Sequence, residues 1–214
     1  MSPNEGLTIA VPRGALMGET LDLLEGLGLD VSEVRSNQRK LLFAELGIVT
    51  MRPSDVPTYV EHGAADIGIT GKDVLLEGGE REVYELLDLG FGRCRMIVAE
   101  RDGEDTIAES LRRLGTFTVA TKYPRIALDH FTATGRPVGI VEVKGSVELA
   151  PLTGLADGIV DLTASGRTLV ENRLVEREEI VVCTARLIAN PVAHKLKAAA
   201  IDSLLARIGE LISR

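Results

Sequence analysis

The sequence has no tryptophan, few other aromatic residues and no long hydrophobic run. Aromatic residues make up 3% of its 214 residues, whereas hydrophobic residues of all kinds make up 45% and charged residues 26%. This balance is typical of a folded globular protein with an aliphatic core and excludes a disordered chain. No apolar run reaches the roughly 18 residues that a membrane span needs, and the start "MSPNEGLTIAVP" is not that of a secretion signal. We therefore expect a cytoplasmic protein with no membrane partner.

Basic residues are outnumbered by acidic ones, 24 to 32, which gives a net charge of −8. This charge repels nucleic acid, and no stripe of Lys and Arg with interleaved aromatics offsets it, so we expect no nucleic-acid partner. The charge does not exclude an anionic small molecule. A phosphate site is built locally, from backbone N–H groups and a few basic side chains.

Cysteine occurs only twice, at Cys94 and Cys183, each inside an apolar, strand-like run. The two are not spaced as metal ligands. In a cytoplasmic protein this pattern favours buried, reduced thiols over a disulfide or a metal site.

Short apolar runs alternate with segments of helical spacing along the chain. Examples are "LTIAV" followed by "ALMGETLDLLEGLG", and "TFTVAT" followed by "PRIALDHFTATG". Alternation of this kind predicts an α/β fold with mostly parallel sheets, in which ligands bind at the carboxyl ends of the strands. "EIVVCTARLIAN" (179–190) is expected to be one long strand, and the chain from Val192 to Ile212 one amphipathic helix.

The most polar junction in the chain is "AERDGEDT", Ala99 to Thr106. We place the passage between two lobes near it, and the long strand after Leu174 then returns the chain to the first lobe. The predicted division is lobe I at residues 1–98 plus 180–214 and lobe II at residues 99–179. The active site is expected in a cleft between the lobes.

The stretch "GIVDLTASGRTLVE", Gly158 to Glu171, carries the first candidate site. An apolar strand runs into Asp161 and then into a turn that offers the hydroxyls of Thr163, Ser165 and Thr168. A glycine inside such a turn lets the backbone approach a phosphate, while the acid can hold ribose hydroxyls or approach a metal. The other interpretation is an ordinary strand-to-helix turn with a serine cap.

The order of strand, acid and Ser/Thr-Gly-x-Thr turn resembles the loop with which phosphoribosyltransferases hold phosphoribosyl pyrophosphate. Type I members of that class have two adjacent acids before the loop. Here Val160 precedes Asp161, which argues against type I.

Five segments in the same order along the whole chain resemble the ATP phosphoribosyltransferase family. They are "IAVPRGAL", "RPSDVPTYVEHGAADIGITGKDVL", "VATKYPRIA", "VKGSVELAPLTGLADGIVDLTASGRTL" and "IANP". The resemblance implies two lobes similar to type II periplasmic binding proteins. It also implies transfer of phosphoribosyl from phosphoribosyl pyrophosphate to N1 of ATP, with Mg²⁺ and release of pyrophosphate, as the first step of histidine biosynthesis.

The length resembles the short form of the family, because long-form members carry a regulatory domain after the final helix. The short form works in a hetero-oligomer with a separate regulatory subunit similar to a histidyl-tRNA synthetase catalytic core. The resemblance therefore implies that partner here.

On the second lobe, we assign the 5-phosphate to a loop and the ribose hydroxyls to Asp161. The loop residues are Thr163, Ala164, Ser165, Gly166, Arg167 and Thr168. Glu142 and Lys144 face the ribose and pyrophosphate in one interpretation and form an exposed charge pair in the other. We nominate no general base, and the sequence does not identify the ligands of the metal.

On the nucleotide and pyrophosphate side, the candidates are Arg13, Gly14, Asp66, Gly71 and Lys122. Asp66 and Gly71, in "ADIGITG", are expected at the carboxyl end of a strand. Lys122 is either a pyrophosphate ligand or a solvated lysine at a strand end. Members of the family that this chain resembles usually have a basic residue where Ala15 stands here, so we expect no phosphate contact from this side chain.

Two other functions remain open at this point. One is a ligand sensor of the same two-lobed architecture, against which the missing secretion signal and the phosphate-type loop argue. The other is a type I phosphoribosyltransferase that acts on a free base. Turnover with adenine or guanine instead of ATP would identify the second.

Overall fold

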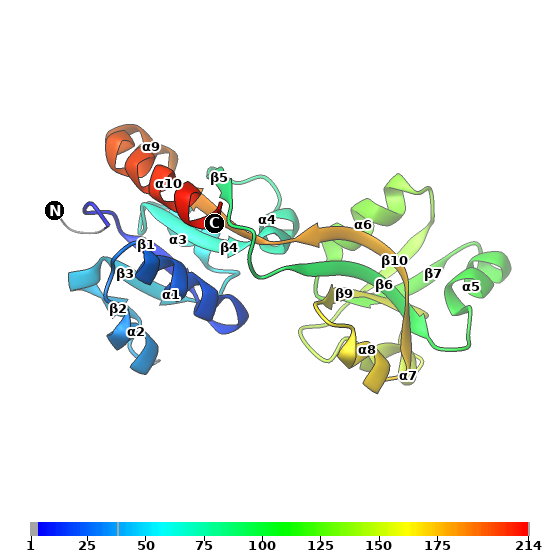
Figure 1. Ribbon diagram of the computed structural model, residues 1–214. Coiled ribbons are helices and arrows are strands. Elements are labelled where there is room, and N and C mark those ends of the chain that lie inside the picture. Colours follow the sequence, from blue (N-terminus) through cyan, green and yellow to red (C-terminus); the bar gives the residue numbers. More distant parts are fainter. Residues whose placement is uncertain (1–3, 38, 214) are drawn as a thin grey trace. The chain divides into compact units, whose positions relative to one another are not determined.

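The chain forms two compact units, which the computed structural model describes over residues 4–37 and 39–213. Unit 1 is Met1–Gly92 with Thr184–Arg214, and unit 2 is Arg93–Cys183. Each unit contains one mixed sheet with helices packed on it (Figure 1). This is the α/β architecture with two sheets that the alternating pattern predicts.

Unit 1 contains a sheet of strand order β2-β3-β1-β4-β11-β5. The strands are β1 (Ile9–Pro12), β2 (Leu42–Phe43), β3 (Ile48–Met51), β4 (Ile67–Gly71), β5 (Tyr84–Asp88) and β11 (Ala185–Ala189). The helical segments are η1 (Gly14–Leu16), α1 (Met17–Gly26), α2 (Ser32–Ser36), η2 (Ala44–Leu46), α3 (Val56–Glu61), α4 (Lys72–Gly78), α9 (Pro191–Leu196) and α10 (Ala198–Ile212).

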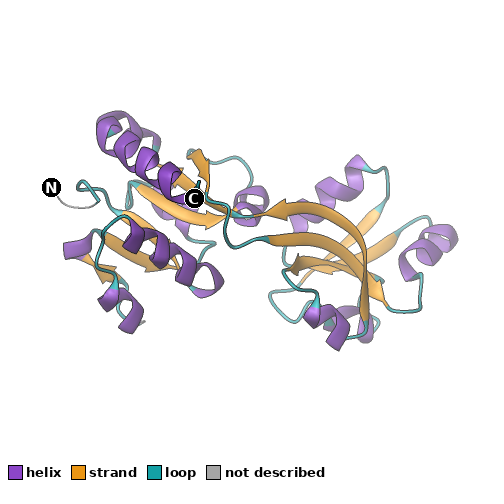
Figure 2. Ribbon diagram, in the orientation of Figure 1, coloured by secondary structure: helices purple, strands orange, loops and turns teal. Residues whose placement is uncertain are grey.

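Both faces of the unit 1 sheet are buried, because successive strand residues point to opposite sides. Ile9 of β1 packs in a cluster with leucines of α1 and α10, including Leu24 and Leu204. Ala10, the next residue, packs on the other face with Val56 and Val60 of α3. The continuous apolar run "IAV" is therefore explained by helices on both sides, as in buried parallel strands (Figure 2).

Unit 2 contains a sheet of strand order β10-β6-β9-β7-β8. The strands are β6 (Cys94–Arg101), β7 (Phe117–Thr121), β8 (Val138–Glu142), β9 (Gly158–Thr163) and β10 (Leu174–Cys183). The helices are α5 (Thr106–Leu114), α6 (Pro124–Ala133), α7 (Leu149–Leu152) and α8 (Arg167–Glu171).

Each sheet contains three neighbouring parallel strands to which antiparallel strands are added. In unit 2, β7 pairs in parallel with β8 and with β9, so that Thr121 lies opposite both Glu142 and Val160. β6 and β10 then pair antiparallel. The carboxyl ends of β7, β8 and β9 consequently lie along one edge of this sheet, and we call it the carboxyl edge of unit 2.

The division between the units differs from the predicted one at both boundaries. Boundaries after residue 98 and before residue 180 would cut through β6 and β10, which pair with each other along their length. The expected long strand is in fact two strands, β10 and β11, separated at Thr184. β10 pairs in unit 2 and β11 in unit 1, so the chain changes sheet between them.

The expected C-terminal helix is also two helices, α9 and α10, with Lys197 between them. Lys197 has φ −118° and ψ 30°, outside the helical region, although its N–H still donates to the carbonyl of Ala193. An apolar stripe alone does not reveal such a break. Within the described residues, no helix is long and apolar enough to cross a membrane.

Candidate functional site

The carboxyl edge of unit 2 brings together the candidates that follow its three parallel strands. Lys122 comes directly after β7, Glu142 ends β8, and the loop 163–168 follows β9. The register of β7 with its two neighbours places these positions side by side. A sheet edge of this kind is where ligands bind in α/β folds.

Two side-chain hydroxyls of the loop after β9 accept hydrogen bonds from the backbone of the same loop. The hydroxyl Oγ1 of Thr163 accepts a hydrogen bond from the N–H of Gly166 at 2.9 Å, and Oγ of Ser165 accepts one from the N–H of Arg167 at 3.4 Å. Among the described residues, the N–H groups of Ala164 and Ser165 have no hydrogen-bond partner. These donors are available for an anion.

Gly166 gives this loop its sharp turn. Its φ of 73° lies in the left-handed region that side chains other than glycine rarely adopt, and a Cβ placed there would have no heavy atom within 4 Å. The position is therefore constrained by the backbone and open in space. A ligand can therefore approach the main chain closely at Gly166.

Asp161 is the partly buried acid of this edge. Its Oδ1 accepts a hydrogen bond from the N–H of Leu162 at 2.9 Å. Burial raises the pKa of Asp161, the Leu162 N–H and the charge of Lys122 act in the opposite direction, and the charge of Glu148 adds to the rise. A ligand that donates hydrogen bonds to this carboxylate would replace the water that burial has removed.

Glu142 and Lys144 form the exposed charge pair of the second interpretation. Lys144 Nζ bonds Glu142 Oε1, and their side chains are 89% and 48% exposed. An exposed pair contributes little to stability. Both charges therefore remain available at the carboxyl edge.

Unit 1 has a corresponding edge at the ends of β1 and β4. Arg13 and Gly14 follow β1, and Gly71 ends β4, which pairs in parallel with β1. A pocket of about 400 Å³ opens beside Arg13, with Tyr59 among its lining residues. The other lining residues are Leu41, Leu42, Val49, Thr50, Met51, Arg52 and Asp55.

Asp66 does not lie where the sequence predicts it. It precedes β4, at the amino end of the strand, whereas Gly71 is at the carboxyl end. Its Oδ2 accepts a hydrogen bond from the N–H of Thr8 at 2.7 Å and forms an ion pair with Lys197 Nζ at 2.7 Å. Asp66 therefore links the start of β1 to the break between α9 and α10, and we remove it from the candidate site.

Glu148 was missed by the sequence analysis. It lies just before α7, and its charge acts on Asp161 across the fold. The residues around it, "GSVELAP", carry no local signal of this coupling. The coupling between Glu148 and Asp161 depends on the packing of α7 against the sheet, and a local sequence pattern does not predict that packing.

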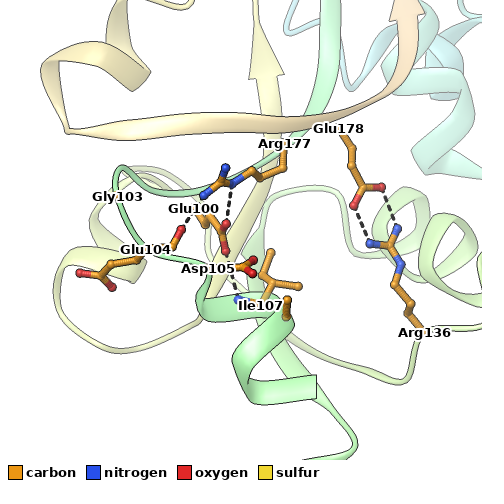
Figure 3. Close-up of a pocket in the computed structure, with 9 residues that line it drawn as sticks. Glu100, Gly103, Glu104, Asp105, Ile107, Arg136, Arg177 and Glu178 are labelled. Carbon is orange, nitrogen blue, oxygen red and sulfur yellow. Dashed lines mark hydrogen bonds and ion pairs between the residues drawn. The ribbon is translucent and has the colours of Figure 1, made fainter. Parts of the chain in front are cut away.

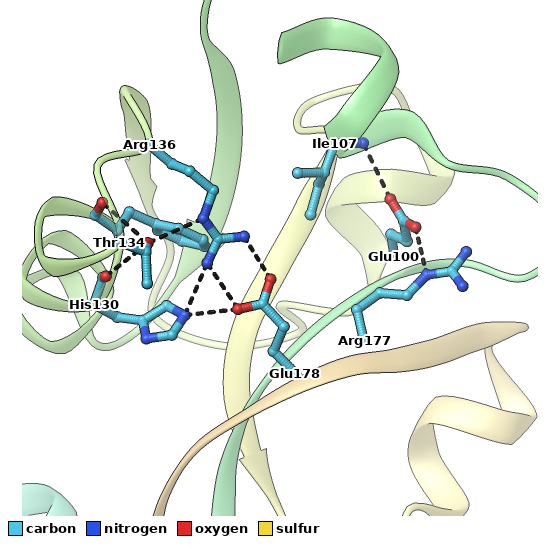
Figure 4. Close-up of polar contacts among 8 residues, drawn as sticks. Glu100, Ile107, His130, Thr134, Arg136, Arg177 and Glu178 are labelled. Carbon is cyan, nitrogen blue, oxygen red and sulfur yellow. Dashed lines mark hydrogen bonds and ion pairs between the residues drawn. The ribbon is translucent and has the colours of Figure 1, made fainter. Parts of the chain in front are cut away.

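A second pocket, of about 540 Å³, has Glu100, Arg136 and Arg177 among its lining residues (Figure 3). Glu100 follows Ala99, which pairs with Ile159 near the amino end of β9, whereas the loop lies at the carboxyl end of that strand. The charged residues of this pocket bond one another. Glu100, which is 1% exposed, accepts hydrogen bonds from the N–H of Ile107 and from Arg177 (Figure 4). Arg136 forms two hydrogen bonds to Glu178 at 2.5 and 2.7 Å, and these lower the pKa of Glu178. Because these charged residues bond one another, we interpret them as a network that stabilises the fold and not as a ligand site.

Replacing Arg177 by Ala is expected to destabilise the protein by about 2 kcal/mol, because the carboxylate of Glu100 stays buried without its counter-ion. The cost is below that of a fully buried pair because Arg177 is 40% exposed. Adding Glu100→Gln to this variant should recover most of the loss, since the amide oxygen still accepts from Ile107. Urea unfolding of both variants measures this. An equal loss in the single and the double variant would contradict it.

Comparison with known proteins identifies the family. The family model described as ATP phosphoribosyltransferase matches residues 52–210. An ATP phosphoribosyltransferase of Rubrobacter xylanophilus is 49% identical over 207 residues, which cover 95% of each chain. A chain of the ATP phosphoribosyl transferase (HisG:HisZ) complex from Thermotoga maritima superposes with a TM-score of 0.78 at 35% identity, covering 97% of this chain and 98% of that one.

The fold is also similar to that of periplasmic binding proteins. The aliphatic sulphonate binding protein SsuA from Escherichia coli superposes with a TM-score of 0.61 at 13% identity, covering 97% of this chain and 72% of that chain. At this identity the likeness concerns the fold alone. By its family match and its identity to curated relatives over nearly its whole length, the chain belongs to the ATP phosphoribosyltransferase family, the pentosyltransferases that catalyse the first step of histidine biosynthesis.

Proposed function

We propose that the carboxyl edge of unit 2 binds phosphoribosyl pyrophosphate and that this chain transfers its phosphoribosyl group to N1 of ATP, releasing pyrophosphate. The observation that carries the proposal is the loop after β9. It combines the N–H groups of Ala164 and Ser165, which have no hydrogen-bond partner in the described part of the chain, a glycine at φ 73°, and the acid Asp161 two residues before the loop.

In this proposal the loop holds the 5-phosphate and Asp161 holds the ribose hydroxyls. The N–H groups of the loop supply the anion donors, so Ala164 contributes through its backbone alone. Thr168 is exposed, and its hydroxyl could turn toward the phosphate. The side chain of Arg167 is 84% exposed and pairs with Glu171 at 3.8 Å, so a phosphate would compete with that exposed pair for the guanidinium. Fixing the phosphate and the ribose at two points orients the anomeric carbon for attack.

The reaction is a displacement at the anomeric carbon. Its transition state has oxocarbenium character, and negative charge grows on the departing pyrophosphate. Groups that neutralise this charge lower the barrier most, because N1 of adenine is already nucleophilic and needs no base. We assign this role on unit 2 to Lys122, which directly follows β7 and whose charge acts on Asp161. Arg13 and Gly14 are the corresponding candidates on unit 1, with Gly71 at the same edge.

The metal that we propose is Mg²⁺, brought in by the substrate. No group of three or more His, Cys, Asp or Glu side chains that could hold a metal occurs among the described residues. Mg²⁺ commonly binds through one or two carboxylates, waters and substrate phosphates, which fits a site whose acids are Asp161, Glu142 and Glu148. When bound, the ion would supply positive charge to the pyrophosphate.

We further propose a cytoplasmic hetero-oligomer with a regulatory subunit similar to a histidyl-tRNA synthetase catalytic core. Two observations support it: the likeness to a chain from the HisG:HisZ complex of Thermotoga maritima, and the coverage of 98% of that chain by this one.

The proposal is tested by pyrophosphate release from ATP and phosphoribosyl pyrophosphate with Mg²⁺, with and without the candidate regulatory subunit. We expect turnover in the mixture and none when adenine or guanine replaces ATP. The product should carry the phosphoribosyl group on N1 of the adenine ring, which mass spectrometry and ultraviolet absorbance can verify.

Turnover with free adenine would instead identify a phosphoribosyltransferase of the free-base class. Tight binding of both substrates with no pyrophosphate release, with the regulatory subunit present, would favour the ligand sensor. Either result would overturn the proposed function.

A further inference from the structure

The two cysteines of the chain lie directly opposite each other in the sheet of unit 2. Cys94 is the first residue of β6, Cys183 is the last residue of β10, and the two are register partners in this antiparallel pair. Directly opposite residues in antiparallel strands have Cα atoms about 4.5 to 5.5 Å apart and side chains on the same face. A disulfide requires a Cα separation of about 4.4 to 6.8 Å.

No disulfide joins the two cysteines in the structure, and they differ in access, so the prediction of buried thiols is met by Cys183 and not by Cys94. Cys94 is partly exposed, whereas Cys183 is 1% exposed. A small oxidant can therefore reach Cys94 first. Cys183, its register partner, is then in position to attack the sulfur of Cys94, so that one molecule of oxidant is enough to oxidise both thiols.

The register pair Cys94–Cys183 lies where the chain passes from one unit to the other. The boundaries between units fall at Gly92/Arg93 and at Cys183/Thr184. On the unit 1 side the same two segments are held together as well, because the N–H of Ala185 donates to the carbonyl of Phe91 at 2.9 Å. A disulfide between Cys94 and Cys183 would add a covalent bond between the two segments that this hydrogen bond already links.

We propose that Cys94 and Cys183 are a reversible dithiol–disulfide pair that reacts with low-molecular-weight disulfides. The thiolate of Cys94 attacks the small disulfide, releases one small thiol and becomes a mixed disulfide. The thiolate of Cys183 then attacks the Cys94 sulfur and releases the second small thiol. The protein loses two protons and two electrons, and the small disulfide takes up the same two protons and two electrons to become two thiols. Disulfides of this kind in reducing compartments are transient and respond to oxidants.

The test treats the full chain with oxidised glutathione at neutral pH and then measures intact mass and titratable thiols in denaturant. We expect a monomer whose mass is lower by two hydrogens, with no titratable thiol and no glutathione adduct, and recovery of both thiols with dithiothreitol. In Cys183→Ala we expect one stable glutathione adduct, at Cys94. In Cys94→Ala the remaining thiol should stay unmodified over the same period.

Three results would overturn the proposal in the wild-type chain alone, whether or not the variants fold. They are persistence of both thiols, accumulation of two glutathione adducts, and disulfide-linked dimers on a non-reducing gel. The test does not depend on enzymatic activity, so its outcome is separate from that of the proposed function.

Discussion

Replacing Gly166 by Asp is expected to reduce the affinity for phosphoribosyl pyrophosphate by roughly 10³-fold or more, while the protein stays folded. A carboxylate placed about 4 Å from the proposed 5-phosphate would cost about 4 kcal/mol at an effective dielectric constant near 20. The backbone cost is smaller, about 1 kcal/mol for a side chain in the left-handed region. A Cβ at this position would have no heavy atom within 4 Å beyond its chain neighbours, so the substitution should not displace packed residues.

Gly166→Asn is the matched control for this prediction. Asn has nearly the same size as Asp and tolerates the left-handed region, but it carries no charge. The difference in affinity between the two variants, measured by calorimetry, therefore isolates the charge from the shape. Thermal unfolding should show similar stability for both. Wild-type affinity in the Asp variant would show that the 5-phosphate binds elsewhere.

The sequence alone predicted the position of the loop after β9, because the signals for this loop are local. The run "GIVDL" predicts a buried strand, and the turn that follows must lie at the strand's carboxyl end. Lys122 could be placed at the same edge because it follows another strand of the same alternating pattern. Helical crossovers make neighbouring strands parallel, so their carboxyl ends meet.

The errors came from features that depend on the exact end of a strand or on distant contacts. Asp66 was placed at the wrong end of β4 because "ADIGITG" shows an extended segment but not where its pairing begins. The pairing of Cys94 with Cys183 depends on β10 returning beside β6, and two isolated cysteines carry no such information. The influence of Glu148 on Asp161 likewise arises only when α7 packs on the sheet.

Replacing Asp161 by Asn is expected to lower kcat/KM for phosphoribosyl pyrophosphate by roughly 10²-fold and to raise the stability of the substrate-free protein at neutral pH. The kinetic loss follows because hydrogen bonds between ribose hydroxyls and a charged acceptor contribute about 1.5 to 3 kcal/mol each. Asn retains the acceptor for the Leu162 N–H, so the local backbone should be preserved. Only the charge is removed.

The gain in stability follows from the raised pKa of Asp161, whose main cause is burial. A carboxyl whose folded pKa exceeds its unfolded value binds its proton more tightly in the folded state. Its contribution to stability is therefore complete below the unfolded pKa, near 3.9, and is lost as the pH rises through the folded pKa. The advantage of the Asn variant should thus be present at pH 7 and disappear as the pH falls below about 4.

Urea unfolding of the wild type and of Asp161→Asn between pH 3.5 and 8 measures this difference, and steady-state kinetics at neutral pH measure the loss of turnover. Asp102→Asn, at an exposed turn of the same unit, is the control and should change neither quantity. The two effects have opposite signs because a buried carboxylate destabilises the empty site and is compensated only when ribose hydroxyls bind it. An Asn variant that is less stable at pH 7 and fully active would show that Asp161 serves the fold instead of the substrate.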